Sequence, residues 1–180
     1  MLNTTSTLIA ATPASDGASP SVGPEAVPIL LEVNGTARTV RAEPRMTLAE
    51  TLRGPLELTG TKIACNRGAC SACTVWLDGL PVCSCMILAT EVGTRRVTTI
   101  EGLAKGDMLH PIQQAFIDHD ALQCGFCTSG MVMSCAALLE RNPVPNTDDV
   151  CAAISGHICR CGTYPHVIAA TLAAATVHKA

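Results

Sequence analysis

The chain has 180 residues, of which 48% are hydrophobic, and a formal net charge of −3. This length suits one ordinary domain or two small ones, and the near-balanced charge lacks the basic field that a nucleic-acid partner requires. No apolar run reaches the roughly 18 residues that span a bilayer, so the composition also predicts no membrane partner.

Residues 1–27 are rich in Thr, Ser, Ala, Pro and Gly and show no hydrophobic periodicity. Such a composition is typical of a flexible extension, which we expect here. The positively charged start of a secretory signal and the paired arginines of a twin-arginine signal are not found in residues 1–27. We therefore expect a cytoplasmic location, with the periplasm as the alternative.

Residues 28–104 carry the signals of a small α+β domain. Asn34-Gly35 and Asp78-Gly79 are turn pairs that tolerate positive φ, and each lies between two short β-forming runs. Thr47 and Glu50 fit a capping box at the start of a short helix that Gly54-Pro55 ends. The strands are expected at residues 29–33, 36–40, 74–77, 80–84 and 96–100.

Residues 105–180 have helical periodicity and predict an all-α domain of four helices. Pro111 begins the first helix, and Asn142-Pro143 ends the second. Thr147 is the expected cap of the third helix, and Pro165 begins the fourth. The expected core faces of the last three helices are Met131, Cys135 and Leu138, then Cys151, Ile154 and Ile158, then Ile168, Leu172 and Ala175.

The eleven cysteines fall in tight groups instead of spreading along the chain. A spread of cysteines in a small secreted chain indicates a disulfide framework, whereas close groups of thiols favour a metal centre. Each half of the chain is also small enough to benefit from a metal that stabilises its fold. The sequence therefore predicts metal binding.

The first group, Cys65, Cys70 and Cys73, has the spacing C-x4-C-x2-C. This is the plant-type [2Fe–2S] spacing, in which three thiolates come from one loop and a fourth from a later strand. A structural zinc site more often shows two C-x2-C pairs. Cys83 and Cys85 lie two apart on a predicted strand and face the same side, so spacing leaves the fourth ligand open between them.

The second group consists of Cys124 and Cys127, spaced C-x2-C, and Cys159 and Cys161, spaced C-x-C. Each pair precedes a predicted helix, whose N-terminal N–H groups favour an anionic assembly of thiolates. Spacing alone does not separate zinc from a [2Fe–2S] cluster here. The residues around these cysteines are more informative.

Those flanking residues resemble the molybdenum hydroxylases, the family of xanthine dehydrogenase and aldehyde oxidoreductase. Residues 65–75 run Cys-Asn-Arg-Gly-Ala-Cys-Ser-Ala-Cys-Thr-Val, and residues 77–85 run Leu-Asp-Gly-Leu-Pro-Val-Cys-Ser-Cys. Residues 123–131 run Gln-Cys-Gly-Phe-Cys-Thr-Ser-Gly-Met, and residues 155–164 run Ser-Gly-His-Ile-Cys-Arg-Cys-Gly-Thr-Tyr. The resemblance covers about residues 28–178.

The resemblance implies a β-grasp ferredoxin-like domain followed by a four-helix domain, with one [2Fe–2S] cluster in each. It favours Cys85 as the fourth ligand of the first cluster, after Cys65, Cys70 and Cys73. It assigns the second cluster to Cys124, Cys127, Cys159 and Cys161, and it places Gln123 and Cys161 against the molybdopterin of a large partner subunit. A medium subunit with FAD is the further partner it implies, and electrons run from molybdenum through the second cluster and the first to FAD.

The resemblance also implies that substrate binds in the partner, so no catalytic residue is expected in this chain. Aldehyde oxidation is the expected reaction of the complex, with an N-heterocycle as the alternative substrate. A free-standing ferredoxin-like carrier and a zinc-stabilised interaction module are the alternatives from other classes. Cys135 and Cys151 are expected in the core, His157 as an ordinary loop residue, and Trp76 as hydrophobic cover on the hairpin.

Overall fold

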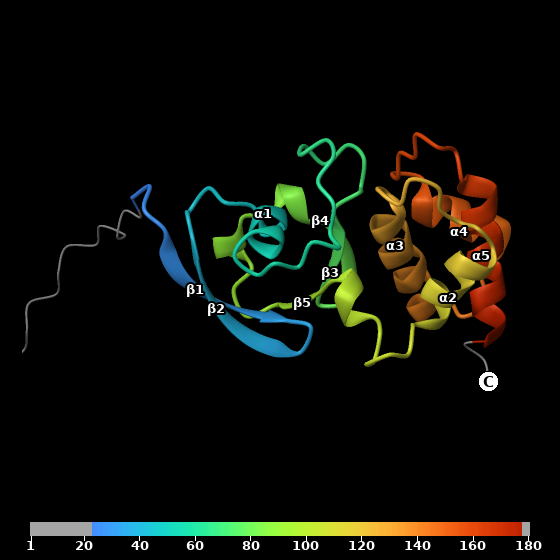
Figure 1. The fold of residues 1–180 in the computed structure, drawn as a ribbon, viewed down its shortest axis with the longest axis horizontal. Coiled ribbons are helices and arrows are strands. Elements are labelled where there is room, and N and C mark those ends of the chain that lie inside the picture. The colour runs from blue at the N-terminus through green and yellow to red at the C-terminus, as the bar shows by residue number, and fades with distance from the viewer. Residues whose placement is uncertain (1–22, 178–180) are drawn as a thin grey trace, which may run out of the picture.

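The computed structural model describes residues 23–177, in two packed parts that follow one another along the chain (Figure 1). Most of the predicted extension, residues 1–22, lies outside the described residues. A sheet with one helix forms the N-terminal part, and helices form the C-terminal part. Within residues 23–177, no helix has both the length and the apolar character needed to cross a membrane.

The sheet has five strands in the order β2-β1-β5-β3-β4. The two predicted hairpins are confirmed, and β5 joins them by pairing parallel with β1 and antiparallel with β3. Asn34, Gly35, Asp78 and Gly79 all have positive φ, as the hairpin turns require. The strands are β1 (Val27–Val33), β2 (Thr36–Ala42), β3 (Thr74–Leu77), β4 (Leu80–Cys83) and β5 (Arg96–Thr98).

β4 and β5 are shorter than predicted because each runs into a 3-10 turn. The chain after β4 turns through Ser84–Met86, and a further turn, Ala89–Glu91, precedes β5. The chain after β5 turns through Ile100–Gly102. The first of these turns matters for the cysteines, since Cys85 lies in it and not on the strand.

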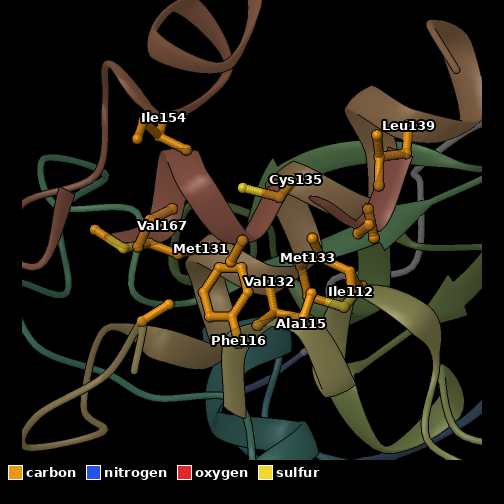
Figure 2. Packing of buried hydrophobic residues seen from close by; sticks show 14 of the residues in the cluster. Ile112, Ala115, Phe116, Met131, Val132, Met133, Cys135, Leu139, Ile154 and Val167 are labelled. Carbon is orange, nitrogen blue, oxygen red and sulfur yellow. The ribbon is translucent and has the colours of Figure 1, made fainter. Parts of the chain in front are cut away.

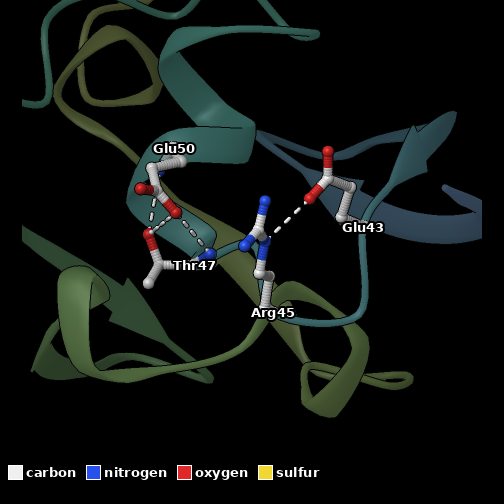
Figure 3. A network of polar contacts seen from close by, with 4 residues as sticks. All are labelled: Glu43, Arg45, Thr47 and Glu50. Carbon is white, nitrogen blue, oxygen red and sulfur yellow. Dashed lines mark hydrogen bonds and ion pairs between the residues drawn. The ribbon is translucent and has the colours of Figure 1, made fainter. Parts of the chain in front are cut away.

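Helix α1 (Leu48–Arg53) begins with the predicted capping box. The Thr47 hydroxyl accepts from the Glu50 N–H at 3.2 Å, and the Glu50 carboxylate accepts from the Thr47 N–H at 2.8 Å (Figure 3). Arg45 and Glu43 form an exposed ion pair beside this cap. Leu48 and Leu52 of α1 are fully buried against the sheet, so the helix covers one face of it.

Four helices follow in the C-terminal part, and together with the sheet they confirm the predicted α+β content. Pro111 begins α2, as predicted, and α3 ends directly before Asn142-Pro143. The helices are α2 (Pro111–Asp118), α3 (Thr128–Arg141), α4 (Thr147–Ile154) and α5 (Tyr164–Val177).

Helix α3 lies between the sheet and the other helices, and its predicted apolar stripe is confirmed. Met131 and Cys135 are fully buried, and Phe116 of α2 and Val167 of α5 belong to the same core (Figure 2). Burial raises the pKa of the Cys135 thiol to about 11, so it stays protonated and acts as a small apolar side chain.

Three details predicted for the last two helices are wrong. The cap of α4 is Asn146, whose side chain accepts from the Asp149 N–H at 3.0 Å; Thr147 is already the first helical residue. Cys151 and Ile158 are exposed, because α4 ends at Ile154 and turns Cys151 away from α3. The most buried face of α5 carries Val167, Ala170, Thr171 and Ala174; of the predicted face, Ala175 is buried, whereas Ile168 and Leu172 are only partly covered.

Candidate metal centres

The loop of residues 65–73 carries three thiols and directs backbone N–H groups at sulfur atoms. The N–H groups of Arg67 and Ala69 lie 3.5 and 3.3 Å from the Cys65 sulfur, and that of Gly68 lies 3.3 Å from the Cys85 sulfur. Asn66, Gly68 and Ser71 all have positive φ, which winds the loop into this tight shape. The loop is thus a cradle of N–H donors for anionic sulfur.

The Cys85 sulfur meets a backbone N–H donor of this loop, whereas the Cys83 sulfur contacts only the hydroxyl of a loop side chain. Cys85 is buried beside Cys73 and Ala49 of α1, whereas the Cys83 sulfur lies 3.7 Å from the Ser71 hydroxyl. The prediction that both cysteines face the same side of one strand is wrong, because the turn Ser84–Met86 replaces the strand after Cys83. Geometry separates the two cysteines where spacing could not.

The four thiols of this first set lie in two pairs. Hydrogen bonds from the backbone of Arg67, and next from the Cys70 side chain, lower the pKa of Cys65 to about 7. Burial is the main cause that raises the pKa of Cys73 to about 12; a hydrogen bond from the Cys85 backbone opposes it, and the Cys85 thiol adds to it. Cys65 therefore lies where a thiolate is favoured, and Cys73 lies where a free thiolate is disfavoured.

The second set comes from two separate segments of the helical part. Cys127 caps the N-terminus of α3, and Cys159 lies in the loop that leads into α5. The Tyr164 hydroxyl accepts from the Cys159 N–H at 2.8 Å and donates to the His157 carbonyl at 2.9 Å, which holds that loop in shape. Cys124 is exposed, and so is its neighbour Gln123, so this set lies at the protein surface.

The second set also lies in two pairs. Burial raises the pKa of Cys127 to about 12, with a further contribution from Cys159. Burial raises the pKa of Cys159 as well, but hydrogen bonds from the Thr163 backbone and hydroxyl outweigh it and bring that pKa to about 7. Hydrogen bonds from the Phe126 backbone, and next from the Cys161 side chain, lower the pKa of Cys124.

The pairing of the thiols helps to distinguish a site for a single metal ion from a site for a two-iron cluster. Among residues 23–177, no three His, Cys, Asp or Glu side chains come together as ligands of one metal ion. The thiols meet two by two, and a [2Fe–2S] cluster takes two thiolates on each of its two irons. The donor chemistry and the pairing of both sets therefore fit a two-iron cluster.

The two sets are joined by contacts that the sequence did not reveal. The Ile158 N–H, next to Cys159, donates to the Cys70 carbonyl at 3.2 Å. His157, predicted as an ordinary loop residue, is buried between the two parts, and burial lowers its pKa. Its place two residues before Cys159 was the only signal in the sequence. The Trp76 indole N–H donates to the Met133 carbonyl at 2.8 Å, so this side chain covers the helical core as well as the hairpin.

Family models match both halves of the chain. The 2Fe-2S iron-sulfur cluster binding domain matches residues 31–109, and the [2Fe-2S] binding domain matches residues 99–172.

Relatives match most of the chain. The nicotine 6-hydroxylase small subunit of Paenarthrobacter nicotinovorans is 48% identical over 81% of this chain and 88% of its own length. The aldehyde oxidoreductase iron-sulfur-binding subunit PaoA of Escherichia coli is 42% identical over 92% of this chain and 76% of its own length. A chain of quinoline 2-oxidoreductase from Pseudomonas putida 86 is 41% identical and superposes with a TM-score of 0.83, covering 86% of this chain and 97% of that one.

Proposed function

This chain belongs to the iron–sulfur small subunits of the molybdenum hydroxylases, and on that premise we propose the ligands of its two clusters. Its role is electron transfer as a subunit of an oxidoreductase complex. One [2Fe–2S] cluster is held by Cys65, Cys70, Cys73 and Cys85, and the other by Cys124, Cys127, Cys159 and Cys161. The observation that carries this assignment is the two-and-two pairing of thiols in each set.

Each bound cluster supplies one-electron chemistry, and the chain's own residues adapt the sites to it. N–H groups of the loop 65–73 donate to the sulfur atoms of Cys65 and Cys85, and such hydrogen bonds stabilise negative charge at sulfur and raise the reduction potential. The buried sulfurs of Cys73 and Cys127 keep water from one side of each site.

The proposed order of electron flow is the one that the resemblance to the family implies. Cys124 and Gln123 lie at the surface, which leaves the second set open to a large molybdopterin subunit, with Gln123 and Cys161 against the pterin. Electrons then pass through the second set to the first and on to the FAD of a medium subunit. Within this scheme the fold is a β-grasp domain over residues 28–104 and a four-helix domain over residues 105–180.

The substrate of the complex is an aldehyde, oxidised to a carboxylic acid. The match to the aldehyde oxidoreductase subunit PaoA takes in 92% of this chain, whereas the match to the nicotine 6-hydroxylase subunit takes in 81%. An N-heterocycle is the second candidate substrate, because the nicotine 6-hydroxylase subunit is 48% identical to this chain and PaoA is 42% identical. Substrate binds in the partner subunit in either case.

Cofactor analysis of the complex, purified from its native host through a tag on this chain, tests the proposal. We expect about four irons per chain, as two [2Fe–2S] clusters require, together with molybdenum and FAD, and faster turnover of aldehydes than of N-heterocycles. Zinc in place of iron contradicts the cluster assignment, and iron without molybdenum or a partner protein indicates a free-standing carrier. Cell fractionation with the same tag tests the proposed cytoplasmic location against the periplasm.

A further inference from the structure

The sheet part and the helical part meet along a seam that also joins the two cysteine sets. On one side of the seam backbone meets backbone: a Cβ atom added at Gly130 of α3 would lie 2.4 Å from the Ser71 carbonyl oxygen. The Ile158 N–H donates to the Cys70 carbonyl a short distance along the same seam. The loops that carry the two sets therefore touch directly.

His157 lies in this seam with only 6% of its surface exposed. Its Nε2 atom is 3.1 Å from the Gly130 carbonyl oxygen, 3.1 Å from the Ser134 hydroxyl and 3.4 Å from the Thr74 hydroxyl. A carbonyl oxygen only accepts, so Nε2 carries the ring proton and donates it. The Thr74 hydroxyl in turn donates to the Ser71 carbonyl at 2.7 Å, which carries the network into the first cysteine loop.

This ring and its partners come from three chain segments that bear cysteines of both sets. Thr74 directly follows Cys73 of the first set, Gly130 lies three residues after Cys127 of the second, and His157 itself lies two residues before Cys159. A shift of the ring therefore changes the separation of the two sets.

On one side of the ring, protein packing does not contribute to this separation. His157 borders an open surface pocket of about 190 Å³ that is lined mainly by small or polar residues, among them Ser71, Cys83 and Ser134. No side chain fills the pocket, so on that side the contact of His157 with Thr74 links the helical part to the sheet part.

We propose that His157 is a positioning residue that fixes the distance between the two cysteine sets and thereby the coupling between the clusters held there. The inference rests on the ligand assignment above. The inference concerns the distance between the clusters, whereas the ligand assignment concerns how each cluster is bound. An experiment can therefore contradict one without contradicting the other.

The test uses the whole complex, with His157→Phe and His157→Gln in this chain. Phenylalanine keeps a planar ring without a donor, whereas glutamine brings an N–H donor back near the position of Nε2. Iron is counted first, and then the EPR spectrum of the fully reduced complex is recorded, because the magnetic interaction between two reduced clusters depends on their separation. His166→Gln is the matched control: this exposed histidine of α5 contacts the His119 carbonyl and joins no cysteine loop to the other part.

We expect the His157→Phe complex to keep its irons but to show a changed splitting of the EPR signals, because that splitting comes from the interaction between the two clusters. We expect His157→Gln to show the splitting of the unchanged complex. Unchanged splitting in His157→Phe overturns the proposal, even when the complex unfolds at a lower temperature, because a purely structural residue has that effect alone. If His157→Phe does not assemble, Thr74→Val and Thr74→Ser decide the question. The valine variant then changes the splitting and the serine variant does not; equal spectra overturn the proposal. Loss of iron in Cys73→Ser remains a separate test of the ligand assignment.

Discussion

The two cysteine sets reach the same chemistry by different routes. The first set takes three of its four thiols from a single loop, whose backbone supplies N–H donors to sulfur. The second set takes two thiols from each of two segments more than thirty residues apart, and it depends on α3, α5 and the Tyr164 hydroxyl to bring them together. One site is formed by local backbone conformation, and the other by tertiary packing.

This difference determines which perturbations each site should tolerate. A change in the packing between α3 and its neighbours should reach the second set first, because nothing local holds Cys124/Cys127 to Cys159/Cys161. A change within the loop 65–73 should stay in the first set. Where the two parts touch, at Gly130 and His157, a single change should reach both.

Removing one ligand from each set is the strongest test. Cys73→Ser and Cys127→Ser should each lower the iron content from about four to about two per chain, because a cluster that loses a thiolate from a buried site is not retained. Metal analysis and visible absorption measure the loss. Cys151→Ser, at an exposed thiol of α4, is the matched control and should keep all the iron. Loss of all the iron in Cys73→Ser would mean that the second site does not form independently.

The sequence predicted the local site better than the packed one. The spacing of Cys65, Cys70 and Cys73 already indicated a [2Fe–2S] loop, whereas the second set needed its flanking residues to distinguish it from zinc. The hairpin turns and the Thr47 cap were also predicted, because each depends on residues close in sequence.

Features set by tertiary contacts were predicted less well. The exposure of Cys151 and Ile158 depends on where α4 ends relative to α3, which helical periodicity does not specify. The burial of His157 depends on how the helical part packs against β3. The separation of Cys83 from Cys85 depends on the 3-10 turn that ends β4 early. None of these has a signal within a short window of sequence.

Gly130→Ala should give the next largest effect, since the added methyl group meets the backbone of Ser71 and Ala72. We expect a loss of about 3 kcal/mol, at the upper end for overpacking, because a backbone carbonyl cannot rotate away. Denaturant unfolding of the full chain with its clusters measures it. Gly156→Ala is the graded control: its Cβ would lie 3.3 Å from the Ser71 hydroxyl, which can move, so its cost should be clearly smaller. Equal costs would mean that the two parts are not in firm contact at Gly130.

Tyr164→Phe should affect the second set before the first. It removes the hydroxyl that satisfies both the Cys159 N–H and the His157 carbonyl, and leaving such partly buried groups unpaired costs about 1–2 kcal/mol. We expect the second cluster to be lost first on heating, while the first keeps its spectrum. EPR of the reduced protein along a temperature series separates the two signals. Loss of both clusters together would show that the sites unfold as one unit.

The helix caps give the smallest and most local comparison. Thr47→Ala and Asn146→Ala each remove a side-chain acceptor for a helix N–H, at a cost of about 1 kcal/mol. Ala49 of α1 packs against Cys73 and Cys85, so Thr47→Ala should raise amide hydrogen exchange both in α1 and in the first cysteine loop. α4 carries no cysteine of either set, so Asn146→Ala should raise exchange in α4 and leave both loops protected. If the two variants raise exchange equally throughout the chain, the first site is not the locally formed unit that its backbone hydrogen bonds indicate.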